Sequence, residues 1–480
     1  MILSNVTFKR KFSFSAYKNH KILMSEMTFT KDFVTDTRGD LYPVLFKSED
    51  CQESVAYNCY HLHNGNIKRW TAQFFPYSTY EMTAHTSNGK CGFFFSIPSG
   101  QAEILTDGRK LYMSASCESH SSQDTISIPD WVDNTWTMLI SCRPGAFDIF
   151  FKRNQQPIFF HSFCTEIFDN SSHQDIFMNG AVAVSAEGTV TLCAVSSYID
   201  CGGSQADMRA IRYENGQVMV EQGKIYLTMS IRIQEKYFQA IFSWVPGTAQ
   251  LEMTGALFFD SGDGNWCGDI SSSILYHRQW KKWLLWVVSF NHDHVLGHSS
   301  FDGDPRFGVN VIDIELMEQA PAGTAISTFA GIPHDEDPDF FYDEVQDKWF
   351  MAICRLDPSI DNRYRYIFFE SSSPFEGYKY IGQSLEGTET GGSFVKIKGE
   401  QLFVCGNDFA LTSNYRIYSK DGMENAKFDL PDGGFRGWGT LIPVPQGSRT
   451  RYYWITFDRH NHSDYKWSYG NLYCFEAILS

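Results

Sequence analysis

The segment DPDFFYDEVQDKWFMAICR (residues 337–355) opens with an acidic residue, continues as a short apolar run, and turns through polar residues into an aromatic-rich second run. Two further segments repeat this pattern, DISSSILYHRQWKKWLLWVVS (269–289) and ETGGSFVKIKGEQLFVCGN (389–407). Weaker copies are YENGQVMVEQGKIYLTMSIR (213–232) and GWGTLIPVPQGSRTRYYWITFDRH (437–460). Short runs of this kind, bounded by Gly, Asn, Asp, Ser or Pro, are typical of β-strands. The sequence therefore predicts five copies of one β unit.

The five units follow one another at intervals of about 50–70 residues, which is within the repeat length of β-propeller blades. In a propeller the innermost strand of each blade faces a central axis, so residues at equivalent blade positions converge there. We therefore predict a five-bladed β-propeller over residues 207–480. The opening acidic residues Asp269, Asp337 and Glu389 are expected at equivalent blade positions, in one axial pocket.

The preceding part of the chain also has strand patterns, but it lacks the repeat. The stretches EILTDGRKLYM and FDIFFKRNQQPIFF are hairpin-like, with two runs joined by a polar turn. We predict an antiparallel β-sandwich over residues 27–206, of the lectin-like, jelly-roll kind. The line DWVDNTWTMLISCRPGAFDIFF (130–151) resembles a strand pair of laminin-G domains. Residues 1–26 are expected to be an N-terminal tail, and Gly202 and Gly203 mark the linker between the two domains.

Composition narrows the classes of partner. The chain has 480 residues, of which 43% are hydrophobic and 16% aromatic, and its net charge is −16. Such a charge gives no basic field to attract nucleic acid or an anionic membrane. No apolar run approaches the ~20 residues that cross a bilayer, and the first residues lack the pattern of a signal peptide. The 12 cysteines contain no CxxC pair, so we expect reduced thiols and a cytoplasmic location.

The repeated units resemble the five-bladed propeller glycoside hydrolases, which include the arabinanases and xylosidases of family 43 and the invertases of family 32. EDPDFFYDEVQDKWFM matches their Asp-Pro strand, TETGGSFVKIKGEQLFV matches their acid strand, and GDISSSILYHRQWKKWLLW is a looser match. The resemblance implies hydrolysis of a glycosidic bond, with Glu389 as general acid, Asp337 as the residue that orients and tunes, and Asp269 as base or nucleophile. The first unit departs from the pattern, since only Glu214 lies near its aligned position. Either the catalytic set is shifted by one blade, or the base lies elsewhere.

The chemistry itself requires two carboxyl groups in different protonation states. One must be protonated to give a proton to the leaving oxygen, and another must be ionised to activate water or attack carbon. Neighbouring carboxylates and burial separate the pKa values of such a pair. The alternative interpretation is that these acids are turn residues at strand ends. Two other functions stay open: a non-catalytic carbohydrate-binding protein, and a glycoside phosphorylase that binds phosphate through loop arginines.

Loop cations and aromatic rings are candidates to bind an oligosaccharide. The predicted substrate-binding residues are Arg436, Trp438, His292, His294, Arg306, Arg459 and Trp266. Arginine binds carboxylates in a bidentate manner, so Arg436 beside Trp438 suggests an acidic sugar of the kind found in pectin. The alternative for most of these arginines is a salt bridge on an acidic surface.

We expect no catalytic metal and no cofactor. The histidines of NHDHVLGHSS (291–300) are spaced closely enough to share zinc, but they lack a helix or cysteine partners, which favours polar loop roles. The acidic and glycine spacing of FDSGDGNWCGD (259–269) leaves a structural calcium ion open, although it lacks the features of an EF-hand.

Overall fold

The computed structural model describes residues 3, 6–14, 20–35, 42–170, 172–202, 204–233, 236–266, 268–317, 334–357, 363–385, 387–407, 414–429, 438–447, 449–457 and 471–478. They form two compact units, one of residues 1–20 with 201–480 and the other of residues 21–200. No helix in these described ranges is long and apolar enough to cross a membrane. Every cysteine among them is a free thiol.

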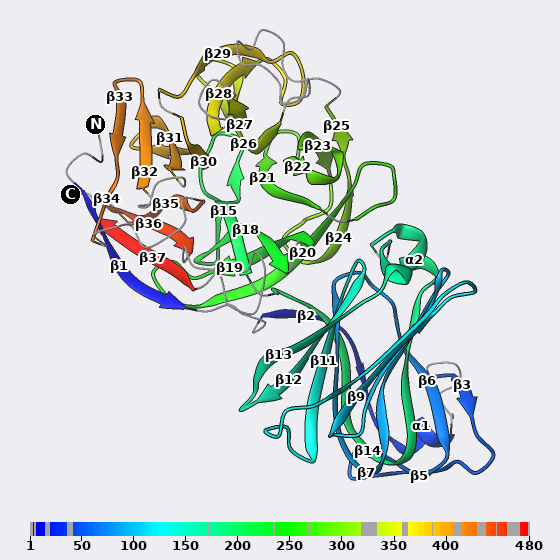
Figure 1. Cartoon of the computed structure of the whole chain (residues 1–480). Coiled ribbons are helices and arrows are strands. Elements are labelled where there is room, and N and C mark those ends of the chain that lie inside the picture. Colours follow the sequence, from blue (N-terminus) through cyan, green and yellow to red (C-terminus); the bar gives the residue numbers. More distant parts are fainter. Residues whose placement is uncertain are drawn as a thin grey trace. The chain divides into compact units, whose positions relative to one another are not determined.

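The larger unit is built from five sheets of mostly antiparallel strands, numbered here as blades I to V (Figure 1). Blade I contains β15 (Ser204–Ala210), β17 (Val220–Glu221), β18 (Lys224–Ile233), β19 (Lys236–Trp244), β20 (Leu251–Asp260) and β24 (Gly308–Asp313). Blade II contains β16 (Arg212–Tyr213), β21 (Asp269–His277), β22 (Lys282–Ser289), β23 (Val295–Phe301) and β25 (Glu315–Leu316). Blade III contains β26 (Asp335–Asp343), β27 (Lys348–Asp357), β28 (Arg363–Ser371) and β29 (Lys379–Gln383). Blade IV contains β30 (Glu389–Ile397), β31 (Glu400–Asn407), β32 (Asn414–Ser419) and β33 (Gly422–Asn425). Blade V contains β34 (Lys427–Phe428), β35 (Thr440–Gln446), β36 (Arg449–Phe457), β37 (Leu472–Ile478) and β1 (Thr7–Phe14).

The first strands of the five blades form a closed ring. Going around it, β15 contacts β21, β21 contacts β26, β26 contacts β30, β30 contacts β35, and β35 contacts β15. Apolar side chains fill the space between neighbouring blades. Trp283 lies in the core shared by blades I and II, while Trp286 and Trp349 lie in the core shared by blades II and III. The five-bladed β-propeller predicted from the repeated segments is confirmed.

Blade V is completed by a strand from the other end of the chain. β1 pairs in antiparallel register with β37, and Figure 1 shows the blue β1 beside the red β37. Phe8 is fully buried, with ring centroids 5.4 Å from Phe428 and 5.2 Å from Trp454. Residues 7–14 of the expected tail over residues 1–26 are therefore the outer strand of blade V. The physical reason is that β37 would otherwise present an unpaired edge.

The smaller unit is an antiparallel β-structure inserted between β1 and β15. Its longest strands, β7 (Ser78–Ile97) and β14 (Ala181–Asp200), pair over almost their whole length. The other elements are β2 (Lys21–Met27), α1 (Lys31–Thr35), β3 (Val44–Lys47), β4 (Gln52–Ala56), β5 (Cys59–Asn64), β6 (Asn66–Gln73), β8 (Gly100–Thr106), β9 (Lys110–Ser116), β10 (Ser121–Ser127), β11 (Thr135–Arg143), β12 (Ala146–Arg153), β13 (Gln156–Cys164), η2 (Glu166–Phe168) and α2 (Gln174–Asn179). Both halves of the β7–β14 ribbon contribute to one apolar core.

Two glycines allow the ribbon to shift register at its middle. A Cβ atom on Gly89 would lie 2.2 Å from the carbonyl oxygen of Glu187, and one on Gly188, where φ is +75°, would lie 2.4 Å from that of Asn88. Only glycine fits such an approach.

The boundaries of this unit differ from those predicted. β2 joins it by pairing with β14, and residues 204–206 belong to β15 of blade I. The unit therefore spans residues 21–200 rather than 27–206, and the propeller takes residues from both sides of it rather than 207–480 alone. The lectin-like, jelly-roll topology of this unit stays a prediction.

Candidate active site

The first strands of blades I to IV share a β-bulge near their N-terminal ends. Register shifts lie between Ala206 and Arg209, Ile270 and Ser273, Glu336 and Asp339, and Thr390 and Ser393. The first bulged residue has positive φ in every case: Asp207 52°, Ser271 59°, Asp337 48° and Gly391 61°. A bulge changes the direction of a side chain and is common beside active sites. Because the four strands are neighbours in the ring, equivalent residues come together near the axis.

This register corrects the alignment of the three acidic residues. Asp337 is the bulged residue of blade III, whereas Asp269 and Glu389 each lie two residues before their bulges. Their equivalent in blade III is Asp335, and the equivalent of Asp337 in blade I is Asp207. The alternation of apolar residues in a sequence does not reveal one extra residue in a strand. The three opening acids therefore aligned in sequence, although Asp337 lies two positions further along its strand than Asp269 and Glu389 do.

Asp337 is buried and surrounded by donors. Its carboxylate accepts hydrogen bonds from Ser271 Oγ, from Thr390 Oγ1 at 2.7 Å and from the Gly391 amide at 2.8 Å. Arg209 Nη2 lies 3.5 Å from its Oδ1. Burial alone would raise the pKa of Asp337, but the Arg209 charge and these hydrogen bonds lower it below the usual value. Asp337 is therefore an ionised group held in one orientation by three blades.

Arg209 links the equivalent acids of blades I and III. Its Nη1 donates to Ser271 Oγ at 3.0 Å, and its Nε donates to the carbonyl of Gly392 at 3.3 Å. Burial would lower the pKa of Arg209, but attraction to carboxylates that include Asp337 and Asp207 raises it. The guanidinium thus stays charged and stabilises the ionised form of both acids.

The pKa of Glu389 is shifted in the opposite direction to that of Asp337. It is fully buried, and its Oε1 accepts hydrogen bonds from Arg416 Nη1 at 2.9 Å and from the hydroxyl of Tyr418. Burial raises its pKa above the usual value, and hydrogen bonds from Ser384, Tyr418 and Arg416 offset this only in part. A carboxyl group that holds its proton at higher pH suits a general acid.

Asp269 is also buried, at 5% exposure. Its pKa is raised to about 7, chiefly by burial. The charges of Asp263 and Asp260 add to the rise, and a hydrogen bond from Ser289 offsets part of it. Asp269 therefore holds its proton to a higher pH than an ordinary aspartate does.

The residues predicted to bind substrate differ from one another in burial and in bonding partners. Arg306 is buried, with ion pairs to Asp304 at 2.7 Å and Glu221 at 2.8 Å. Its guanidinium also lies over the rings of Tyr226 and Trp283, at 4.7 and 5.3 Å from their centroids. These contacts make Arg306 a structural residue between blades I and II, which corrects the expectation that it binds substrate.

Trp266 is buried as well, and its indole nitrogen donates to Asp260 at 3.1 Å, which leaves little ring surface for stacking on a sugar. His292 hydrogen-bonds to Ser289 at 2.8 Å. Trp438 is half-buried, with its ring 6.0 Å from that of Phe457. Arg436 and Arg459 lie outside the described residues.

The loop whose spacing left a structural calcium ion open has carboxylates that accept hydrogen bonds from its own backbone. Asp260 Oδ1 accepts from the amides of Gly262 at 2.8 Å and Gly264 at 3.1 Å, and Asp263 Oδ1 accepts from the amide of Asn265. Such hydrogen bonds order the turns of the loop.

Reasoning from the sequence missed four residues of this site: Asp207, Arg209, Arg416 and Tyr418. A signal for the first two was present, since ADMRAIRY and EDPDFFYD share an acid followed by an apolar residue and an alternating run. Placing the domain boundary at Asp207 concealed it. Arg416 and Tyr418 come from β32, and nothing in the sequence shows that this strand faces Glu389.

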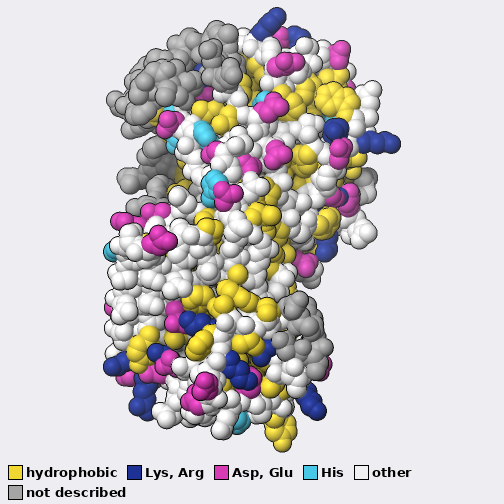
Figure 2. All heavy atoms as spheres, turned by 90° about the vertical axis from the view of Figure 1, so that its right-hand side faces the viewer, with side chains coloured by type: hydrophobic (Ala, Val, Ile, Leu, Met, Phe, Trp, Pro, Cys, Tyr) yellow, Lys and Arg dark blue, Asp and Glu magenta, His cyan; other side chains and the backbone are white. Residues whose placement is uncertain are grey.

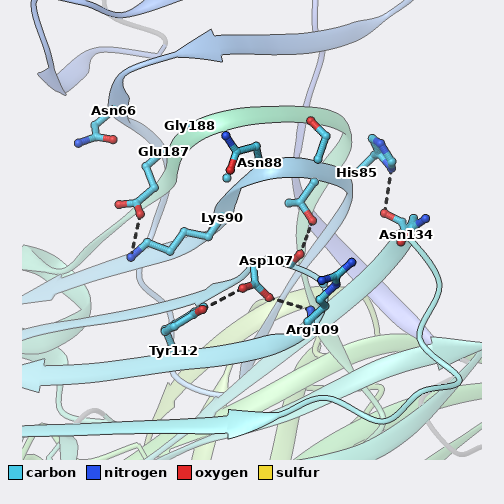
Figure 3. Close-up of a pocket in the computed structure, with 14 residues that line it drawn as sticks. Asn66, His85, Asn88, Lys90, Asp107, Arg109, Tyr112, Asn134, Glu187 and Gly188 are labelled. Atoms are coloured by element: carbon cyan, nitrogen blue, oxygen red, sulfur yellow. Dashed lines mark hydrogen bonds and ion pairs between the residues drawn. The ribbon is translucent and has the colours of Figure 1, made fainter.

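The smaller unit has a polar cavity of about 680 Å³ at the register shift of the β7–β14 ribbon. Figure 3 shows Lys90 directed at Glu187, 2.9 Å away, and Tyr112 directed at Asp107, 2.8 Å away. Its other polar lining residues include His85, Asn88, Arg109 and Asn134. The cavity offers donors, acceptors and one aromatic ring to a polar ligand.

No protein-family model and no curated protein sequence matches the chain. Among solved structures it is similar to a GH43 β-1,3-galactosidase with galactodeoxynojirimycin, at 11% identity and a TM-score of 0.39, covering 56% of this chain and 93% of that one. A GH62 hydrolase in complex with xylotriose is similar at 12% identity and a TM-score of 0.39, covering 57% and 91%. An exo-β-1,3-galactanase from Clostridium thermocellum is similar at 11% identity and a TM-score of 0.39. The match covers 56% of this chain and 62% of that one. The assignment of the larger unit as a five-bladed β-propeller rests on its own closed ring of sheets.

Proposed function

We propose that the propeller unit is a glycoside hydrolase. The observation that carries this proposal is a pair of buried carboxyl groups on adjacent inner strands whose pKa values are shifted in opposite directions. Glu389 on β30 has a raised pKa, and Asp337 on β26 has a lowered one. Thr390, the neighbour of Glu389, donates to Asp337. Hydrolysis of a glycosidic bond requires a protonated carboxyl group, for which Glu389 is suited, and an ionised one, which the charge of Arg209 near Asp337 favours at this axis.

In this proposal Glu389 donates its proton to the leaving oxygen. Asp337 orients the site, because its carboxylate is already occupied by donors from blades II and IV and by the charge of Arg209. The remaining role belongs to an ionised carboxylate that activates water or attacks the sugar carbon.

We assign that role to Asp207 rather than to Asp269. A base must be ionised at working pH, and Arg209 attracts Asp207 electrostatically. Asp269 has no comparable cation among the causes that set its pKa, which is raised to about 7. The two assignments predict different kinetics. If Asp207 is the base, Asp207→Asn loses activity, and if Asp269 is the base, as predicted from the sequence, Asp269→Asn loses it.

The test compares Glu389→Gln, Asp207→Asn and Asp269→Asn on aryl glycosides with good and poor leaving groups and on oligosaccharides. Loss of general acid catalysis should lower kcat by about 10²–10⁴-fold, most strongly with poor leaving groups. Asp207→Asn should lower kcat with all leaving groups, and added azide should restore part of it by replacing the lost carboxylate. Glu400→Gln, at the other end of the same hairpin, is the matched control and should keep full activity.

Three results would favour other interpretations. Equal turnover of Glu389→Gln and the unchanged protein on poor leaving groups would remove Glu389 as the acid. Turnover that depends on inorganic phosphate would identify a phosphorylase. Binding of oligosaccharides with no turnover by the unchanged protein would identify a carbohydrate-binding protein.

We further propose a substrate that carries a carboxylate, such as a uronic acid or 2-keto-3-deoxy sugar of a pectic oligosaccharide. The support is Arg436, which lies between glycines beside Trp438 in the sequence GGFRGWG. Arg209, Arg306 and Arg416 are already paired with carboxylates of the chain, so they do not supply this contact. Arg436→Ala should raise KM for the acidic substrate far more than for a neutral analogue, because a charge-assisted contact contributes about 1.5–3 kcal/mol. Equal effects on both would reject an acidic substrate.

A second function, sugar binding by the smaller unit, is favoured by its polar cavity. Lys90, Arg109, Asn134 and Tyr112 line a space of about 680 Å³, which accommodates one or two sugar rings. The full chain should be retarded in native gels that contain pectin, and Lys90→Ala with Arg109→Ala should abolish the retardation. Lys47→Ala, on a surface strand outside the cavity, serves as the control. Retardation that survives the double substitution would place binding elsewhere.

A further inference from the structure

His294, His334 and Glu336 form a compact group beside the candidate active site. One ligand atom of each residue lies within 4.8 Å of those of the other two. His294 Nδ1 is 2.9 Å from Glu336 Oε1, and both side chains are 20% exposed. The imidazole rings of His294 and His334 stack with centroids 3.5 Å apart. Two imidazoles and one carboxylate this close are the donor set of a three-ligand zinc site with an open position.

Two chain segments, 40 residues apart in sequence, bring these side chains together. His294 follows η3 (Phe290–His292), and both Asp293 and His294 have positive φ, at 53° and 60°. His334 and Glu336 flank the first residue of β26. The Asp335 amide donates to the His294 carbonyl at 3.2 Å, so a backbone hydrogen bond fixes the loop against the strand.

A fourth residue supports the group. The hydroxyl of Tyr364 donates to Glu336 Oε1 at 2.7 Å and lies 3.0 Å from His334 Nδ1. Residues that hydrogen-bond to metal ligands orient them and typically change metal affinity by about 10–100-fold when they are removed. Tyr364 touches two of the three proposed ligands from β28 and is placed for that task.

The other histidines of the segment NHDHVLGHSS have different partners, and His298 lies within β23 rather than in the loop. His292 hydrogen-bonds to Ser289, and His298 lies against Trp286 and Phe375, with ring centroids 4.9 and 4.6 Å away. The zinc site that the spacing of NHDHVLGHSS first suggested would have used histidines of this loop alone. In the structure the loop contributes only His294, and β26 and the residue before it contribute the rest. Figure 2 shows histidine side chains beside acidic side chains on one face of the propeller.

We propose that His294, His334 and Glu336 bind a divalent transition-metal ion of the zinc class. Nitrogen and carboxylate donors favour zinc, cobalt or nickel over calcium, which prefers an all-oxygen shell. The bound ion ties the loop between β22 and β23 to the inner strand of blade III, one residue before Asp337. This proposal is independent of the glycosidase proposal, because it concerns binding of the metal alone.

The experiment is titration of the full, metal-stripped chain with Zn²⁺ by calorimetry and with Co²⁺ by visible absorption. One ion should bind per chain, and a three-ligand site completed by water should give cobalt the intense visible bands of four-coordination. His334→Ala and Glu336→Gln should each weaken binding at least 100-fold, and Tyr364→Phe should weaken it about 10-fold. His292→Ala, in the same loop but outside the group, should leave the affinity unchanged.

Circular dichroism of the metal-free variants separates loss of the site from loss of the fold, and Glu336→Gln preserves side-chain size. Zn²⁺ should raise the Tm of the unchanged chain and of His292→Ala, but not that of Glu336→Gln. The proposal is overturned if the chain binds no stoichiometric metal. It is equally overturned if folded His334→Ala and Glu336→Gln bind zinc as tightly as His292→Ala does.

Discussion

Asp207 and Asp337 occupy the same bulged position in the inner strands of blades I and III, with φ angles of 52° and 48°. Arg209, two residues after Asp207, lies 3.5 Å from Asp337. The positive charge lowers the free energy of both ionised acids, which explains why two carboxylates can be buried near one axis. Each costs several kcal/mol to bury alone, so the pair depends on the cation.

This dependence predicts the effect of removing one partner. Asp337→Asn should lower the free energy of unfolding by about 3–5 kcal/mol, because Arg209 would keep its charge in a buried site without its nearest carboxylate. Urea unfolding measures this, and Asp343→Asn at the exposed end of the same strand should cost far less. The double variant Asp337→Asn with Arg209→Met should recover part of the loss, since it removes the unpaired charge. A double variant as unstable as the sum of the two single changes would contradict the coupling.

The raised pKa of Asp269 predicts a pH dependence of stability. Its ordinary value is 3.8 and its folded value is about 7, so the folded chain binds the proton more tightly than the unfolded chain. Stability is therefore unaffected by this group below pH 4, falls as pH rises from about 4 to 7, and stays lower above pH 7. The loss is at most about 4 kcal/mol at 1.36 kcal/mol per pKa unit.

Asp269→Asn should remove this dependence. Measured by denaturation at pH 5 and pH 8, the variant should gain stability over the unchanged chain at pH 8 and gain less at pH 5. Asp313→Asn, at an exposed aspartate of β24 that is not among the charges that set the pKa of Asp269, keeps the Asp269 carboxyl and is the control. A variant that is less stable than the unchanged chain at pH 8 would show that the ionised carboxylate makes a favourable contact in the folded protein.

The place of β1 as the outer strand of blade V predicts a strong effect of one N-terminal residue. Phe8→Ala should destabilise the propeller by about 3–5 kcal/mol, because a fully buried ring between Phe428 and Trp454 is lost from blade V. Lys9→Ala, the exposed neighbour on the same strand, should change stability by less than about 0.5 kcal/mol. Thermal unfolding of the two variants makes the comparison. Equal Tm values for both would argue against β1 as a structural strand.

The ion pairs of Arg306 predict that its substitution lowers stability and leaves substrate binding unchanged. Arg306→Ala should lower stability by about 1.5–3 kcal/mol, since it removes charge-assisted contacts to Asp304 and Glu221. Its KM for any substrate should stay unchanged. Lys282→Ala, at an ion pair with Asp302 in which both side chains are exposed, should cost no more than about 1 kcal/mol. A rise in KM without loss of stability would return Arg306 to the substrate site.

Strand-level patterns carried the prediction of the fold. The alternation of apolar residues and the repeat of hairpins identified five blades, and the change of pattern near residue 200 identified a separate unit. The N-terminal tail was mispredicted because β1, with Lys9, Arg10 and Lys11 among its phenylalanines, takes its place only by pairing with β37, more than 450 residues later. No local pattern reports such a distant partner.

The sequence by itself determined which chemistry is present: apolar strands with acids at their starts, and arginines and histidines in the loops. These are properties of single residues and short windows, where side-chain period and turn preference act. Only the tertiary structure decided which acids share a bulge position, which cation faces them, and which histidine meets Glu336. The physical reason is that one bulged residue changes the direction of a side chain at little cost to the alternating pattern. Burial and charge then set each pKa through neighbours that come from other blades.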